Sequence, residues 1–273
     1  YNWHDSVHEV SPLNEEGTNS CGYSVLTPCD DNAHGTHTMG TMVGDDGNGN
    51  QIGVAPSAKW IGCRNMDAGW GSPATYIECF EWFLAPTDLN GENMDFTKAP
   101  HIINNSWGCP EEEGCNTGNF EVMSGIVTTL KYAGIVVVVS AGNEGNECET
   151  ITSPAAIFDD SYTVGASNSE GNIAGFSSRG AVSVDGSNRT KPDITAPGVS
   201  VRSCVSWAQD LYFEFSGTSM AGPHTAGVVA LLLSANPGLI GYVDSIEQLL
   251  NLSATPAYTS EGCGGDTPNT LPN

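Results

Sequence analysis

The chain has 273 residues, 39% of them hydrophobic, which is enough to bury the core of one large domain or two small ones. It carries 32 Asp and Glu against 8 Lys and Arg, a formal net charge of −24. Nucleic acids and anionic membranes bind basic surfaces, so both are poor partners for this chain. The longest strongly apolar run, residues 135–139, is too short to cross a bilayer. The composition therefore indicates an acidic globular protein without a transmembrane segment.

The nine cysteines are dispersed along the chain. No two of them have the two-to-four-residue separation that zinc fingers and ribbons use, which argues against a zinc site. Close pairs instead predict short-loop disulfides, and disulfides form in an oxidising compartment. The odd number leaves one cysteine free, or paired with something outside the chain. The three predicted pairs are Cys21/Cys29, Cys63/Cys79 and Cys109/Cys115.

The first 33 residues are polar and rich in Gly, Asn, Ser and Pro, so we expect them to form a loop. Residues 59–64 are then predicted to be a short apolar strand. Residues 74–84 place aromatic and apolar side chains on one helical face, and Pro86 ends this helix. A second strand is predicted at 101–104.

The second half of the chain continues the alternation. Residues 120–130 predict an amphipathic helix that Gly134 closes. Residues 135–139 are β-branched and continuously apolar, which is typical of a central strand buried on both faces. Residues 219–234 contain almost no charge and predict a helix that is buried on all sides. The remaining predictions are a strand at 162–165 and a helix at 245–252.

Strands that alternate with helices predict an α/β fold. We expect a doubly wound, mostly parallel sheet with helices on both faces, in one three-layer domain.

Three segments place polar residues where strands end or helices begin. His34 has small neighbours that let another element approach closely, and Asn143 follows the apolar strand between two glycines. Ser219 begins an uncharged helix, where the helix dipole and free N–H groups favour negative charge on a substrate oxygen. Taken singly, Ser219 is equally typical of a helix N-cap and Asn143 of a turn. The Gly-x-Ser-x-Gly elbow of esterases is absent, because Ala221 replaces its second glycine.

Together these segments and three others resemble the subtilisin-like serine protease family, including its bacillopeptidase-like branch. The matching strings follow the family's order and cover about residues 30–252. They are His34-Gly-Thr-His-Thr-Met-Gly-Thr41, Asn105-Ser-Trp-Gly108, Ser140-Ala-Gly-Asn143, Phe176-Ser-Ser-Arg-Gly180, Lys191-Pro-Asp-Ile-Thr-Ala-Pro-Gly198 and Gly217-Thr-Ser-Met-Ala221.

The resemblance implies a secreted, extracellular and monomeric serine endopeptidase that acts on polypeptides and requires no cofactor. Ser219 would be the nucleophile and His34 the general base, and the amide of Asn143 would join the Ser219 N–H in the oxyanion hole. His37 and His224 would be structural. Extended substrate would add as a strand between two cleft walls. The resemblance assigns one wall to Ser106, Trp107 and Gly108, and the other to Ser140, Ala141 and Gly142.

The pattern fails at the third catalytic residue. The family places an aspartate at the end of an apolar strand before the histidine motif, followed by Thr or Ser and then Gly. No Asp-Thr-Gly or Asp-Ser-Gly occurs in this chain. Asp5 is a poor substitute, because residues 1–4 do not read as a buried strand and Val7 replaces the glycine.

We therefore expect the first strand and its aspartate to lie upstream of residue 1, and a closing helix to lie beyond the C-terminus. Residues 1–273 would then be a single subtilisin-like domain that is truncated at both ends. Because the aspartate holds the histidine in the correct tautomer, the fragment alone would be weakly active or inactive.

Residues 45–50, Asp-Asp-Gly-Asn-Gly-Asn, gather oxygen ligands of the kind that hard cations prefer. A structural calcium ion is one interpretation and an acidic surface turn is the other, so no metal site is assigned. Two further functions stay open beside the endopeptidase. A catalytically inactive binding module would show a changed nucleophile or base, but both are intact, and an esterase lacks its elbow.

Overall fold

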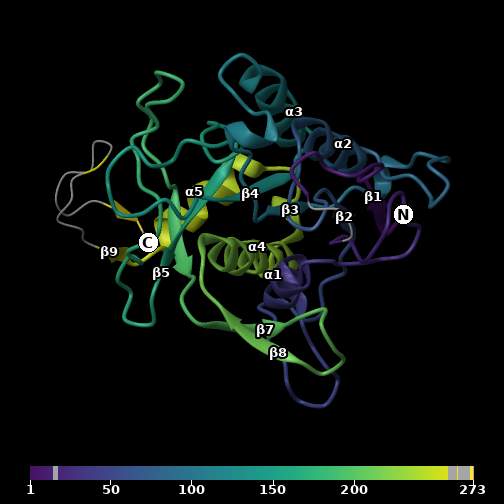
Figure 1. Ribbon diagram of the computed structural model, residues 1–273. Helices are drawn as coiled ribbons and strands as arrows, with labels where there is room; N and C mark the ends of the chain where they lie inside the picture. Colours follow the sequence, from purple (N-terminus) through teal and green to yellow (C-terminus); the bar gives the residue numbers. More distant parts are fainter. Residues whose placement is uncertain (15–17, 258–262, 264–270, 273) are drawn as a thin grey trace.

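The computed structural model describes residues 1–14, 18–257, 263 and 271–272. Its centre is a parallel sheet with the strand order β3-β4-β5-β6, and helices lie on both sides of it (Figure 1). The strands are β3 (Ile102–Asn105), β4 (Val136–Ser140), β5 (Tyr162–Ser167) and β6 (Ile194–Pro197). The helices are α1 (His34–Val43), α2 (Pro73–Leu84), α3 (Phe120–Tyr132), α4 (Thr218–Ala235) and α5 (Val243–Ser253).

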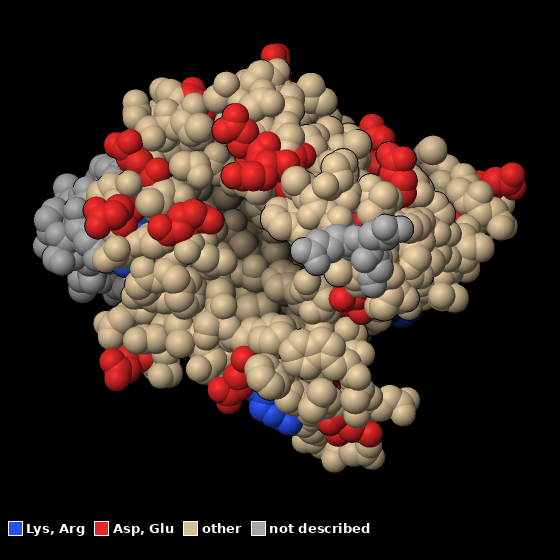
Figure 2. Space-filling view, in the orientation of Figure 1, with Lys and Arg blue, Asp and Glu red and all other residues tan. Residues whose placement is uncertain are grey.

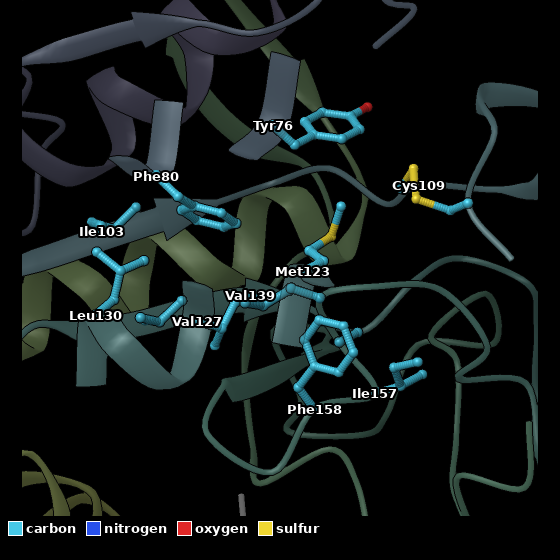
Figure 3. Close-up of a cluster of buried hydrophobic side chains, with 14 of the residues drawn as sticks. Tyr76, Phe80, Ile103, Cys109, Met123, Val127, Leu130, Val139, Ile157 and Phe158 are labelled. Atoms are coloured by element: carbon cyan, nitrogen blue, oxygen red, sulfur yellow. A yellow bond between two sulfur atoms is a disulfide. The ribbon is translucent and has the colours of Figure 1, made fainter. Parts of the chain in front are cut away.

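Strand β4 contributes to two separate cores, because successive side chains of a strand point to opposite faces. Val137 and Val139 pack with residues of α2 and α3 in the core that Figure 3 shows. Val136 and Val138 pack with residues of α4 and α5 on the other face. All four valines are fully buried. The predicted three-layer arrangement of a doubly wound α/β fold is thus confirmed.

Most of the predicted elements are found within two residues of their expected ends. Gly134 follows α3 with φ +84°, the left-handed conformation expected of a glycine after a helix. The predicted strand at 59–64 is reduced to β2 (Gly62–Arg64). The prediction missed β6 and the antiparallel hairpin of β7 (Val201–Cys204) and β8 (Tyr212–Phe215). Single-turn 3₁₀ helices in the described part of the chain include Phe96–Lys98, Glu111–Glu113 and Pro237–Leu239, and β9 (Pro256–Ala257) pairs with β10 (Leu271–Pro272).

The prediction of a loop over the first 33 residues is wrong at its start. Trp3–Asp5 form strand β1, which pairs in parallel with β2. Both Trp3 and Asp5 are buried, so the statement that no buried strand precedes Asp5 is also wrong. The cause is an ion pair: Arg64 of β2 lies 3.2 Å from the Asp5 carboxylate, which lets a charged residue end a buried strand.

Helix α4 is not buried on all sides as predicted. It packs against α1 and against every strand of the central sheet, but Val228 and Leu231 are 44% and 48% exposed. The absence of charge therefore indicates contact along one side of this helix only. None of the helices in the described part of the chain is long and apolar enough to cross a membrane.

The three predicted disulfides are all formed. A fourth joins Cys148 to Cys263, which are 115 positions apart. Cys204 is the free cysteine that the odd number requires.

The acidic stretch 45–50 forms an exposed turn. One Asp46 carboxylate oxygen, Oδ1, accepts the backbone N–H groups of Asn48 and Asn50. No cluster of three His, Cys, Asp or Glu suited to a metal ion occurs in the ranges that the structure describes. The calcium interpretation stays a prediction.

Candidate active site

The two predicted cleft walls follow neighbouring strands. Strands β3 and β4 run parallel with Asn105 opposite Val139. Because the carboxyl ends of parallel strands meet at one edge of the sheet, the segments 106–108 and 141–143 emerge side by side. This edge is where open α/β sheets bind their ligands.

Ser219 is the second residue of α4 and is bonded directly to the first wall. Its hydroxyl donates to the carbonyl oxygen of Ser106 at 3.2 Å, and the Ser106 hydroxyl donates to the carbonyl oxygen of Ser219 at 2.9 Å. Asn104 supports the pair, since its Nδ2 donates to the Ser106 hydroxyl at 2.9 Å. The start of α4 and the end of β3 are thus locked together at the serine.

Asn143 is bonded to the same helix start. Its Oδ1 accepts the backbone N–H of Thr218 at 2.9 Å and the Thr218 hydroxyl at 3.1 Å. The N–H of Gly142 also donates to the Thr218 hydroxyl, at 3.2 Å. The Asn143 side chain is exposed, and its Oδ1 is thus held by the residue that directly precedes Ser219.

His34 is the first residue of α1 and lines a groove together with Ser106. Burial lowers the pKa of His34 below its usual value, while the negative charge of Asp30 raises it and His37 lowers it. The imidazole is therefore neutral at neutral pH, the form in which it accepts a proton. The described contacts include no hydrogen bond from His34 to Ser219, whose hydroxyl is bonded to Ser106 instead.

The groove that His34 lines separates β2 from β3 and has a volume of about 1350 Å³. Residues 59–66 form one side of it and residues 101–107 the other, and side chains of α1, α2 and α4 complete its lining. Within the described residues, β2 pairs only with β1, and β3 pairs only with β4. Each of these parallel strands therefore leaves one edge without a strand partner at the groove.

Asp30, which was not among the residues predicted from the sequence, organises the start of α1. Its carboxylate accepts the N–H groups of Asn32, Ala33 and Thr36, and also the hydroxyl of Thr36. Such a carboxylate supplies acceptors for the free N–H groups at the start of a helix, and its negative charge interacts favourably with the positive end of the helix dipole. Its sequence signal was an aspartate a few residues before a helix start.

Asp5 has a structural role. Besides its ion pair with Arg64, its carboxylate accepts the backbone N–H groups of Val7 and Val25. None of the contacts described for Asp5 involves His34. Both carboxylate oxygens are in use elsewhere, which agrees with its rejection as the third catalytic residue.

His37 and His224 make the contacts of structural residues. The Nε2 of His37 bonds to the carbonyl oxygens of Val201 and Phe213, and its ring stacks on Phe215 with centroids 4.5 Å apart. Nδ1 of His224 bonds to a carbonyl within α4. Both pKa values are lowered by burial, so these histidines stay neutral.

The walls differ in what they expose. Trp107 is half-buried and Gly108 is exposed, whereas Ser140 and Ala141 are buried and only Gly142 is partly exposed. Gly142 has φ +106°, a conformation that glycine adopts without strain. A substrate can therefore reach the backbone of Gly108 and Gly142 more readily than the side chains of the second wall.

Comparison with known proteins agrees with this geometry. The profile of the Subtilase family matches residues 11–267. The chain belongs to the subtilase family. The resemblance inferred from the sequence motifs is thereby confirmed, and with it the homology to subtilisin-like serine endopeptidases.

This subtilase is 37% identical to bacillopeptidase F of Bacillus subtilis (strain 168) over 274 residues, which cover 98% of the chain and 18% of that protein. It is 35% identical to subtilisin E of the same organism over 236 residues, 85% of the chain and 54% of subtilisin E. A cold adapted subtilisin-like serine proteinase of known crystal structure matches with a TM-score of 0.64 and 28% identity, over 88% of this chain and 74% of that one. The chain thus spans about a fifth to about half of these two curated relatives.

Proposed function

We propose that this subtilase is a secreted serine endopeptidase in which Ser219 is the nucleophile and His34 the general base. One observation carries the proposal: Ser219, in the first turn of α4, is hydrogen-bonded to one cleft wall, while its neighbour Thr218 is hydrogen-bonded to Asn143, which follows the other wall. His34 lines the groove that adjoins the first wall.

The geometry supports acyl transfer at Ser219. His34 would take the proton of the serine hydroxyl as that oxygen attacks the peptide carbonyl, and would return it to the leaving amine. The carbonyl oxygen becomes negative in this step. The Nδ2 donors of Asn143 and the backbone N–H of Ser219, at the positive end of the α4 dipole, would stabilise that charge. Water then hydrolyses the acyl-enzyme.

The proposed substrate is extended polypeptide, bound as a strand between the backbone of the two walls. Figure 2 shows a face that is hollowed near its middle and carries many more acidic than basic side chains. This charge distribution disfavours nucleic acid as a partner. Four disulfides favour an oxidising, extracellular location for the enzyme.

The acid partner of His34 is proposed to come from a further strand in the groove between β2 and β3. Both flanking strands present an edge there, and parallel strands of a sheet are most stable when covered and paired. A strand that runs parallel to them would end beside His34 and could carry the aspartate that the family pattern requires. The carboxylate of Asp30 already accepts hydrogen bonds from the start of α1, and the carboxylate of Asp5 is paired with Arg64.

A fluorophosphonate probe tests both parts of the proposal. We would label residues 1–273 and a form that is extended at its N-terminus by its native coding sequence, and locate the label by peptide mass spectrometry. Ser219→Ala and His34→Ala serve as controls in each form. Circular dichroism verifies that every form is folded.

We expect fast labelling of Ser219 in the extended form and labelling slower by orders of magnitude in residues 1–273. Equal, fast labelling of both would contradict the added strand and require an acid within the present chain. Failure of both folded forms to label would contradict the peptidase proposal and favour the inactive binding module.

A further inference from the structure

The wall segment that contains Trp107 is fixed at its two ends by hydrogen bonds and a disulfide. Ser106 is bonded to Ser219 at one end, and Cys109 is bonded to Cys115 at the other. Between these ends, Trp107 is held through its ring. It stacks on Tyr76 of α2 with ring centroids 3.8 Å apart and an angle of 5° between the planes. The position of the wall's middle residue therefore depends on Tyr76.

Tyr76 is in turn fixed by a buried carboxylate. Its hydroxyl donates to Oε2 of Glu113 at 2.7 Å, and the backbone N–H of Gly71 donates to Oε1 of the same side chain at 2.9 Å. Gly71 leaves no free space at the ring, since a Cβ atom there would lie 2.3 Å from Tyr76. Figure 3 shows Tyr76 at the edge of the apolar core, with its hydroxyl directed out of the cluster.

Glu113 is a carboxylate in a largely buried position. It is 8% exposed and has no cationic partner among its described contacts, so burying it is costly. Burial raises its pKa, although the bonds from Gly71 and Tyr76 act in the opposite direction. An apolar side chain would fill the same space without this cost but would leave the Tyr76 hydroxyl unpaired.

The sequence places Glu113 inside the loop that continues the wall. The disulfide between Cys109 and Cys115 closes this loop, and Gly114 turns the chain with φ +96° directly after Glu113. The loop leaves the wall after Gly108 and returns to bond the tyrosine on which the wall's tryptophan stacks. The wall, the loop and helix α2 are thus joined to one another by a disulfide, a hydrogen bond and a ring stack.

We propose that Tyr76 and Glu113 are positioning residues that fix the Trp107 ring, and with it the wall backbone that binds extended peptide substrates. The inference rests on the proposed function, because it concerns the same cleft. None of the described hydrogen bonds, ion pairs and ring contacts joins Tyr76 or Glu113 to Ser219, His34 or Asn143. Their substitution should therefore not change the rate at which a small probe reacts at Ser219. Binding of a peptide long enough to lie along the wall should depend on both residues.

The test uses Tyr76→Phe, Glu113→Gln and the double variant, each made in the extended protein. Affinity for a fluorescent hexapeptide and for the matching dipeptide is measured in the Ser219→Ala background, and fluorophosphonate labelling with Ser219 intact. Tyr162→Phe is the matched control. Tyr162 is 1% exposed and bonds Asn251 at 2.6 Å, but it lies in the core on the other face of the sheet.

We expect Tyr76→Phe and Glu113→Gln each to weaken hexapeptide binding about three- to tenfold, the effect of one hydrogen bond. The double variant should be no weaker than about the worse single one, because the residues act through one bond. Labelling and dipeptide binding should change less than about twofold, and Tyr162→Phe should leave hexapeptide affinity unchanged.

Equal loss of hexapeptide affinity in Tyr76→Phe and Tyr162→Phe would overturn the inference in favour of general destabilisation. So would a slowing of fluorophosphonate labelling by the same factor as the loss of hexapeptide affinity. An unchanged hexapeptide affinity in both Tyr76→Phe and Glu113→Gln would overturn it as well. Failure of the proposed function looks different, since the parent protein itself would then not label at Ser219.

Discussion

Ser106 and Ser219 exchange two hydrogen bonds although they are 113 positions apart in the chain. Each serine uses its hydroxyl to bond the other's backbone carbonyl, so the nucleophile's helix and the substrate-binding wall are joined at the point where chemistry is proposed to occur. The hydroxyl of Ser106 is therefore expected to orient Ser219 rather than to react.

Replacing Ser106 by alanine tests this role. The change removes the donor to the Ser219 carbonyl and leaves the Nδ2 of Asn104 without its acceptor. We expect fluorophosphonate labelling at Ser219 to slow about three- to tenfold, as one neutral hydrogen bond predicts. Ser203→Ala is the control, because the hydroxyl of Ser203 likewise donates to a backbone carbonyl, that of His37 in α1, at 2.8 Å. Similar slowing in both variants would contradict a specific role for Ser106.

Replacing Asn143 by alanine should have a larger effect. It removes the proposed oxyanion donor and leaves the backbone N–H of Thr218 without its 2.9 Å partner. We expect the rate of acylation by a p-nitrophenyl ester to fall about a hundred- to thousandfold, the range that subtilisin itself shows for this kind of donor. Thr218→Ser keeps the contacts to Asn143 and should lose less than about threefold. A loss below about tenfold in Asn143→Ala would contradict the assignment.

The sequence predicted the architecture well because its signals were local. The run of valines at 136–139 and the uncharged helix after Ser219 have a periodicity or composition that sterics and burial impose on any chain. His34, Asn143 and Ser219 could be predicted from sequence motifs for the same reason, since each lies close to the start or end of such an element. The hydrogen bonds that join these segments could not be predicted.

The long-range contacts could not be predicted. Nothing near Asp5 reveals that Arg64 lies beside it, and without that pair a polar segment reads as a loop. The stack of Trp107 on Tyr76 and the Cys148–Cys263 disulfide depend equally on how distant segments meet. Asp30 is intermediate: its capping position was visible in the sequence, but its electrostatic effect on His34 needs the folded distance.

The pH dependence of labelling should follow the neutral form of His34. The rate should rise with pH, and the midpoint of this rise should lie below the usual histidine pKa of 6.5, because burial lowers the pKa of His34. Asp30→Asn removes the charge that raises this pKa, so the acid limb should move to lower pH. Asn retains an acceptor for the start of α1.

The control for this prediction is Asp31→Asn. Asp31 lies next to Asp30 in sequence but bonds Arg64 at 2.6 Å and does not contribute to the pKa shift of His34. Its loss should lower thermal stability and leave the acid limb in place. A shift of the acid limb to higher pH in Asp30→Asn would contradict the electrostatic assignment.

Removal of the disulfide Cys148–Cys263 should destabilise the protein more than removal of Cys21–Cys29, but the two variants should have the same activity. Their separations of 115 and 8 positions predict losses of about 5 and about 2.5 kcal/mol from loop entropy when each pair is changed to serine. Denaturant unfolding measures this difference. Cys148 lies only five positions after Asn143, so a loop that depended on the disulfide would also lose its oxyanion donor.

The contacts of that loop argue for local anchoring instead. Asn143 is bonded to Thr218, the Glu144 N–H donates to Ser178 at 3.0 Å, and the Gly145 N–H donates to the carbonyl of Phe176 at 3.0 Å. None of these three bonds involves Cys148 or Cys263, so we expect them to survive substitution of the disulfide. Labelling at Ser219 under conditions where the protein is folded should therefore stay within about twofold in both double variants. Slower labelling in Cys148→Ser/Cys263→Ser alone would show that the disulfide, and not the start of α4, holds the oxyanion loop.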